Sequence, residues 1–261
     1  MDALQLRVSG RWAQFRKPET NNSPLTHDFI TKTAFIGMMG AVLGIERIPT
    51  MRELFPHWCE DFRFGVCVRG VVKKESWGFT LRRASKYEDV YNSRQLESLN
   101  TKNRAPKQME FLREPNFIVT LALVGQRSAS YFHAFGQRLQ NEEACYTPVL
   151  GLHNCPAELR WVGFTSCQEK NGPYQTSGFV LRADCQALRS LQNGARIAVE
   201  RMPTFQDNDW FNVPSAYREI LYSSPPLPLP EEDQGIQPNA PLLHAAGNHF
   251  YLGNDESWCL I

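Results

Sequence analysis

Residues 117–124 read F-I-V-T-L-A-L-V, the most strand-like run of the chain. Its apolar and β-branched residues are typical of a central strand with both faces buried. Just upstream, residues 100–108 read N-T-K-N-R-A-P-K-Q, which are polar and basic and show no apolar periodicity. This composition predicts an exposed, flexible loop. The sequence therefore places concentrated positive charge on a flexible element beside a rigid one.

The segments around this strand predict an α+β fold. Helical spacing of apolar residues runs from about Thr31 to a stop at Gly44, and a second helix is expected at 130–140. Further strands are expected at residues 4–8, 62–68 and 158–164. The resulting order, βαββαβ, is that of the ferredoxin-like fold, which many RNA-recognition modules share.

The pattern predicts a ferredoxin-like (RRM-like) unit at residues 1–165 and a strand-rich C-terminal extension at 166–261. A long basic insert, about 73–115, interrupts this unit, and a loop of this length is usually functional or disordered. The extension carries strand candidates at 178–182 and 195–202, a Pro-rich linker at about 223–241 and an edge strand at 248–253.

The net charge of +1 hides a strong asymmetry along the chain. Residues 1–61 hold seven basic and seven acidic side chains, residues 62–113 hold twelve and five, and residues 114–261 hold nine and fifteen. A local excess of positive charge beside an acidic remainder is typical of a segment that binds a polyanion. A solvated basic surface without a partner is the alternative that charge alone leaves open.

The composition argues against several protein classes. The start of the chain does not resemble a signal peptide, and no apolar run approaches the roughly 18 residues of a membrane span. Seven cysteines without a C-x-x-C pair favour free thiols in a reducing cytoplasm. The scattered histidines and the lack of common catalytic motifs predict no metal site, no cofactor and no catalytic residues.

Three stretches carry a family resemblance: G-R-W-A-Q-F-R-K-P-E-T at residues 10–20, the segment from P-L-T-H-D-F to G-A-V-L-G at 24–44, and L-N-T-K-N-R-A-P-K-Q-M-E-F-L-R-E-P at 99–115. Together they resemble the fifth CRISPR-associated subunit family of the RAMP superfamily, which caps one end of type I Cascade. The third stretch looks most like the type I-B branch. The resemblance covers about residues 4–165 and continues more weakly to Tyr222.

The resemblance implies a non-catalytic cytoplasmic subunit that binds the 5′ handle of the CRISPR RNA. It also implies docking of the large subunit and the first backbone subunit, with target DNA bound through the complex. The resemblance also implies that the ferredoxin-like unit at 1–165 is a palm and that the insert is a β-hairpin thumb reaching over the RNA. Residues 117–124 would anchor this thumb to the palm. The implied RNA-binding residues are Arg11, Trp12, Phe15, Arg16, Lys17, Asn100, Lys102, Asn103, Arg104, Lys107 and Gln108.

The chemistry of these side chains suits RNA. Lys and Arg would neutralise phosphates, and Asn and Gln would read base edges of an open strand. Trp12 and Phe15 are candidate stacking faces, with core packing as the alternative for both.

Two other functions remain open at this point. The type I-C branch of the family is itself an endoribonuclease that cuts repeat RNA without metal, which needs an acid and a base near the scissile bond. Here the insert holds no histidine, and its candidates are Lys102, Tyr87 and Tyr91. A pure protein-docking scaffold is the other alternative, against which the basic insert argues.

Overall fold

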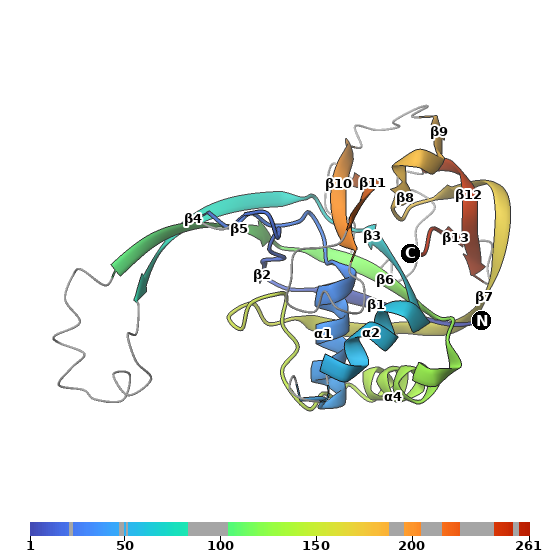
Figure 1. The fold of residues 1–261 in the computed structure, drawn as a ribbon, viewed down its shortest axis with the longest axis horizontal. Coiled ribbons are helices and arrows are strands. Elements are labelled where there is room, and N and C mark those ends of the chain that lie inside the picture. Colours follow the sequence, from blue (N-terminus) through green and yellow to red (C-terminus); the bar gives the residue numbers. More distant parts are fainter. Residues whose placement is uncertain are drawn as a thin grey trace.

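The computed structural model describes residues 1–20, 23–46, 50, 52–82, 104–187, 196–204, 216–224, 243–252 and 256–261. It is an α+β structure built on a curled antiparallel sheet with few helices (Figure 1). The α+β class predicted from the sequence is confirmed. In the part of the chain that the structure describes, no helix is both long and apolar enough to span a membrane. All seven cysteines are free, as expected.

Four strands form the centre of the main sheet, in the order β7-β1-β6-β3 and with every neighbouring pair antiparallel. They are β1 (Asp2–Ser9), β3 (Phe62–Val68), β6 (Asn116–Leu123) and β7 (Glu158–Thr176). Each lies where the sequence predicts a strand, although β7 is much longer than expected. Its first half pairs with β1 and its second half with β12 (Leu243–Leu252), so β7 runs through the predicted boundary at residue 165.

Among the residues that the structure describes, the helices α1, α2 and α4 accompany this sheet (Figure 1). In α1 (Lys32–Leu43), Thr31 accepts a hydrogen bond from the Ala34 amide at 3.3 Å, and Gly44 ends the helix with a φ of 77°. This is the start and stop that the sequence predicts. The second predicted helix is α4 (Ala129–Gln140), preceded by the short turn η4 (Gln126–Ser128).

The helix α2 (Arg52–Asp61) was not expected from the sequence. It contains Pro56, which removes a backbone donor. Trp58 holds it to the core, because its side chain is fully buried and packs edge-on against Tyr131 of α4.

The insert forms an arm of antiparallel strands that projects from the body (Figure 1). β4 (Lys73–Arg82) pairs with β5 (Arg104–Arg113), and β2 (Trp12–Ala13) joins β5 at its base. The prediction of a β-hairpin is confirmed. The prediction of a loop over 100–108 is wrong for residues 104–108, which lie in β5, and residues 100–103 lie outside the described residues.

The C-terminal part adds strands in two places. A small sheet has the strand order β10 (Arg196–Thr204), β11 (Ala216–Ser224), β8 (Val180–Leu181). The short turn η5 (Arg182–Asp184) comes directly after β8 in the chain. β12 extends the main sheet and also pairs with β9 (Cys185–Ala187) and β13 (Glu256–Trp258). The strand predicted at 248–253 is therefore present, but it is not at the edge. Of the predicted linker, Ser223 and Ser224 belong to β11, and 225–241 fall outside the described residues.

The outer edge of β3 is bridged by residues far along the chain. Phe64 exchanges two backbone hydrogen bonds with Ile261, at 2.9 and 3.0 Å, and the Phe179 amide donates to the Val66 carbonyl at 3.0 Å. Gly65 permits this approach, because a Cβ there would lie 2.9 Å from the carbonyl oxygen of Cys259.

Candidate nucleic-acid interface

The register of the arm determines which side chains share a face. β4 and β5 pair without a break from Lys73↔Arg113 to Arg82↔Arg104. Residues directly opposite each other in an antiparallel pair lie on the same face, as do alternate residues of one strand. Trp77 and Phe79 therefore share a face with their register partners Met109 and Lys107.

Four aromatic rings pack together on this face, and we call them the aromatic cluster: Trp12, Trp77, Phe79 and Phe111. Trp12 lies edge-on to Trp77, with ring centroids 4.7 Å apart. Phe111 contacts the other three, at centroid distances between 5.7 and 6.5 Å. The rings thus join β2, β4 and β5 into one unit.

The aromatic cluster has a buried side and an exposed side. Phe111 is 4% exposed, whereas Trp77 is 43% exposed, and Trp12 and Phe79 are half-buried. Exposed aromatic rings on a sheet are the surfaces on which single-stranded nucleic acids stack their bases. The cluster therefore supplies a stacking platform that the fold already holds in place.

Basic side chains border the platform. Lys107 is the register partner of Phe79, while Lys73 and Arg113 lie opposite each other toward the base. Lys73 pairs with Glu114 at 3.2 Å, and Arg113 pairs with Glu75 at 2.9 Å. These are solvent-exposed pairs, which contribute little stability, so a phosphate can replace the carboxylate at small cost.

The base of the arm is fixed to the body by Lys74. Its ammonium lies 2.6 Å from Asp28 and 3.3 Å from Glu110, and it donates to the Thr26 carbonyl at 2.9 Å. Burial alone would lower the pKa of Lys74, but the two carboxylates outweigh it and raise the pKa. The Tyr222 hydroxyl of β11 donates to Asp28 at 2.6 Å, which links this contact to the C-terminal sheet.

A second set of contacts centres on the buried Glu200 of β10. Lys17 pairs with Glu200 at 2.9 Å, and the Asp28 amide donates to the same carboxylate at 3.1 Å. His27 Nδ1 lies 3.2 Å from Glu200, although the two atoms do not form a directed hydrogen bond. We call the connected side chains the ion network: Lys17, His27, Asp28, Lys74, Glu110 and Glu200.

The protonation of Glu200 reflects these partners. Burial would raise the pKa of its carboxyl group, but the interactions with His27 and Lys17 outweigh burial and lower the pKa to about 2. Glu200 therefore carries its charge at neutral pH inside the body, where β10 meets Lys17 and Asp28.

The sequence-predicted site residues separate into three groups. Trp12 belongs to the aromatic cluster, Lys107 and Gln108 lie in β5, and Arg104 begins that strand. Arg11 and Arg16 are exposed near the base of the arm. Asn100, Lys102 and Asn103 lie outside the described residues, as do the nuclease candidates Tyr87 and Tyr91.

Two predicted site residues have other partners. Phe15 is 3% exposed and packs against Phe117 of β6, which favours the alternative of core packing over a stacking face. Lys17 is 22% exposed and committed to Glu200, so its charge is already compensated within the protein.

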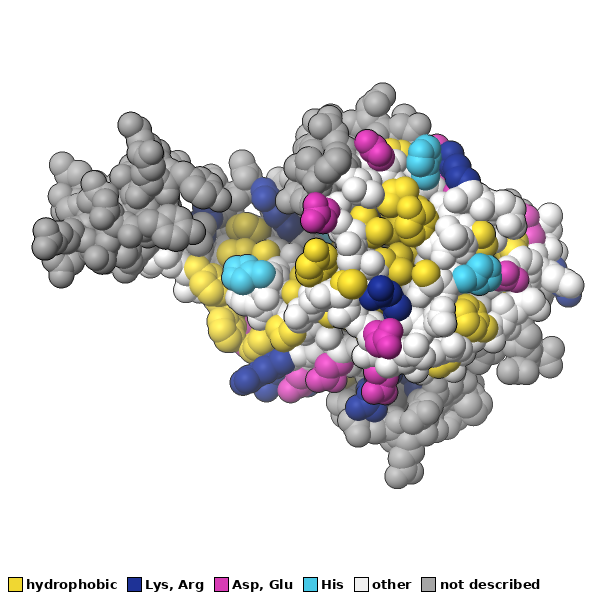
Figure 2. Space-filling view, turned by 90° about the horizontal axis from the view of Figure 1, so that it is seen from below, with side chains coloured by type: hydrophobic (Ala, Val, Ile, Leu, Met, Phe, Trp, Pro, Cys, Tyr) yellow, Lys and Arg dark blue, Asp and Glu magenta, His cyan; other side chains and the backbone are white. Residues whose placement is uncertain are grey.

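Sequence reasoning missed Trp77 and Phe79, the two aromatic residues that β4 contributes. The signal was present, because E-S-W-G-F-T-L at 75–81 alternates with a period of two. On the body, Figure 2 shows single Lys and Arg side chains set among acidic ones, without a broad basic field in the described residues of that face.

Comparisons with known proteins agree with this architecture. A CRISPR protein from Archaeoglobus fulgidus has a similar structure, with a TM-score of 0.58, 11% identity, and coverage of 99% of this chain and 98% of that one. A chain of a CRISPR RNA-guided surveillance complex is also similar, with a TM-score of 0.51 and 13% identity. The match covers 85% of this chain and 89% of that one. No curated protein matches the chain. The family model described as CRISPR-associated protein (Cas_Cas5) matches residues 3–209, and the chain belongs to that family.

Proposed function

We propose that this protein is a non-catalytic subunit of a CRISPR RNA-guided surveillance complex of type I, and that its arm binds the 5′ handle of the guide RNA. The observation that carries the proposal is the exposed aromatic cluster beside the cations of β4 and β5. Family membership and the structural likeness to a chain of such a complex support the setting. The type I-B assignment rests on the resemblance of residues 99–115.

The body of the protein has the element order expected of the palm in this family. With β2, α2, η4 and the arm strands β4 and β5 set aside, the elements β1, α1, β3, β6, α4 and β7 occur in the βαββαβ order. Their strands lie side by side in the order β7-β1-β6-β3. We interpret this unit as a ferredoxin-like palm and the arm as its thumb. The backbone and large subunits would dock on the arm and the C-terminal strands, and target DNA would be bound through the complex.

Trp77→Ala tests the RNA-binding role directly. Stacking of one base on an aromatic ring contributes about 1–3 kcal/mol, so the Kd for a repeat-derived RNA oligonucleotide should rise roughly 5- to 100-fold. Tyr146→Ala is the matched control, because Tyr146 is 52% exposed and lies outside the arm. Filter binding measures both, and equal losses in the two variants would contradict the proposal.

The non-catalytic assignment has a test of its own. Purified protein incubated with repeat RNA and a chelator should leave the RNA intact. Specific cutting with a cyclic phosphate end would instead support the endoribonuclease and direct attention to Lys102, Tyr87 and Tyr91.

A further inference from the structure

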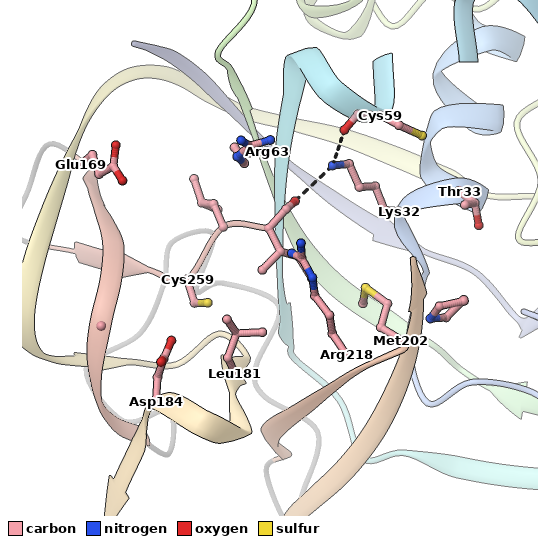
Figure 3. A pocket seen from close by; sticks show the side chains of 14 residues that line it. Lys32, Thr33, Cys59, Arg63, Glu169, Leu181, Asp184, Met202, Arg218 and Cys259 are labelled. Carbon is pink, nitrogen blue, oxygen red and sulfur yellow. Dashed lines mark hydrogen bonds between the residues drawn. The ribbon is translucent and has the colours of Figure 1, made fainter. Parts of the chain in front are cut away.

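A cavity of about 620 Å³ lies between the helical side of the body and the C-terminal strands (Figure 3). This volume is within the range of small-molecule sites. None of its lining residues belongs to β2, β4 or β5, so the cavity is separate from the aromatic cluster.

One side of the cavity is basic. Lys32 comes from α1, Arg63 from β3 and Arg218 from β11, and all three line the cavity (Figure 3). Lys32 donates to the carbonyls of Cys59 and Ile261 at 2.8 and 3.2 Å. Arg63 donates to the Glu60 carbonyl at 3.2 Å. Among the described residues, none of the three cations forms an ion pair with an Asp or Glu side chain.

The surroundings of Lys32 disfavour its charged form. The pKa of Lys32 is lowered to about 8, chiefly by burial, with smaller contributions from Arg63 and Arg218 and an opposing one from Cys59. Nearby like charges disfavour the charged form. A bound oxyanion would reverse this cost, and a doubly charged phosphate would do so more fully than a single carboxylate.

The opposite side of the cavity is acidic. Glu169 of β7 and Asp184 of η5 line it across from the cations in Figure 3. Within the described ranges, neither carboxylate is in an ion pair or a side-chain hydrogen bond. Ionised carboxylates only accept hydrogen bonds, so this side suits a ligand with N–H donors. Gly247 leaves room for Asp184 at the wall, because a Cβ at position 247 would lie 2.7 Å from the Asp184 carboxyl carbon.

We propose that this cavity binds a nucleoside monophosphate, with the phosphate on Lys32, Arg63 and Arg218 and the N–H groups of the base on Glu169 and Asp184. A ligand of this kind carries charge complementary to the two sides, and the cavity is large enough to hold it. A free amino acid also has an anionic group and N–H donors. However, its single carboxylate carries too little charge for three cations, and it would fill much less of the cavity than a nucleoside monophosphate.

Isothermal titration of the full-length protein tests the proposal with GMP, IMP, guanosine and inorganic phosphate as probes. GMP should bind. IMP lacks the exocyclic amine and should bind more weakly, and guanosine lacks the phosphate and should not bind measurably. Inorganic phosphate as tight as GMP would overturn the role of the acidic side, and no binding of GMP would overturn the proposal as a whole.

Two arginine variants locate the site. Arg218→Gln removes a charged donor from an exposed strand position, so the fold should persist while the Kd for GMP rises about tenfold or more. Arg182→Gln is the control, because Arg182 is exposed, pairs with Glu219 at 2.8 Å and does not line the cavity. Equal effects of the two variants would overturn the assignment.

A third variant separates this site from the arm. Trp77→Ala should leave GMP binding unchanged, whether or not it weakens RNA binding. If Trp77→Ala abolished GMP binding, or if an RNA oligonucleotide with a 5′-hydroxyl displaced GMP, the cavity would belong to the RNA interface and the proposal of a separate nucleotide site would be wrong.

Discussion

Two antiparallel strand pairs of this protein have the same hydrogen bonding but different sources of stability. In the pair β1–β6, the inward residues Leu4, Leu6 and Val8 are fully buried. In the arm pair β4–β5, Trp77 is 43% exposed, and the ion network fixes the base. The central strand pair is thus stabilised by burial of its inward face, and the arm by its attachment to the body. This leaves the outer surface of the arm available for a ligand.

The largest difference between the two regions should appear on truncating matched phenylalanines. Phe64→Ala in β3 empties a fully buried site against Phe35 and should lower the free energy of unfolding by about 3–5 kcal/mol. Phe79→Ala in the arm is the control, and it should cost much less because the ring is half-buried. Urea denaturation measures both, and equal costs would show that the arm is part of the packed body.

Acid should weaken the attachment of the arm in a defined pH window. Because the pKa of Glu200 is about 2 in the folded protein against 4.5 unfolded, its stabilisation is complete above pH 4.5 and disappears as the pH falls toward 2. The wild type should have a higher free energy of unfolding than Glu200→Gln at neutral pH. This difference should shrink by up to about 3 kcal/mol as the pH falls through the window. Urea denaturation at a series of pH values measures the change.

Glu114→Gln provides the comparison, since its pair with Lys73 is exposed on both sides. A similar pH dependence in the two variants would contradict the special role of the ion network.

The basic residues 102 and 104 should affect RNA binding rather than stability. Lys102→Ala with Arg104→Ala should weaken binding of the guide RNA without changing the unfolding midpoint. Loss of two phosphate contacts should lower the salt-dependence slope by about 1.4, at roughly 0.7 per contact for a single strand. Filter binding between low and moderate salt measures the slope, and an unchanged slope would count against the thumb assignment.

The smallest effect should come from the exposed pair of Arg113 and Glu75. Glu75→Gln should change the free energy of unfolding by less than about 1 kcal/mol, because both side chains are exposed. RNA affinity should stay equal or rise slightly, since Arg113 is then free for phosphate. A marked loss of RNA affinity would mean that Glu75 itself contacts the ligand.

The central strands could be predicted because their signal is local. The strict alternation of 62–68 and the apolar run of 117–124 each specify a strand within a few residues. The start of β5 was misread because R-A-P-K-Q is polar and contains Pro106. Backbone pairing with β4 makes it a strand, and at Pro106 β5 pairs only with β4, so the proline occupies a local edge where its missing donor is tolerated.

The candidate site was harder to predict from the sequence than the fold. Trp12 was identified from its neighbours in the family motif, but its contact with Trp77 crosses 65 positions of the chain. The pairing of Lys17 with Glu200 crosses 183 positions. No periodicity or spacing encodes such contacts, because they depend on how segments far apart in the chain pack against one another.

The bridged edge of β3 has a consequence for biosynthesis. A ribosome makes the chain from its N-terminus, so β3 and its hairpin partner β6 exist well before Phe179 and Ile261 emerge. During that interval the outer edge of β3 presents unpaired amide and carbonyl groups, which can template aggregation with another nascent chain. Residues 179 and 261 thus reach this edge only after β3 and β6 have been made, and shielding of the edge by a chaperone during that interval should raise the yield of native protein.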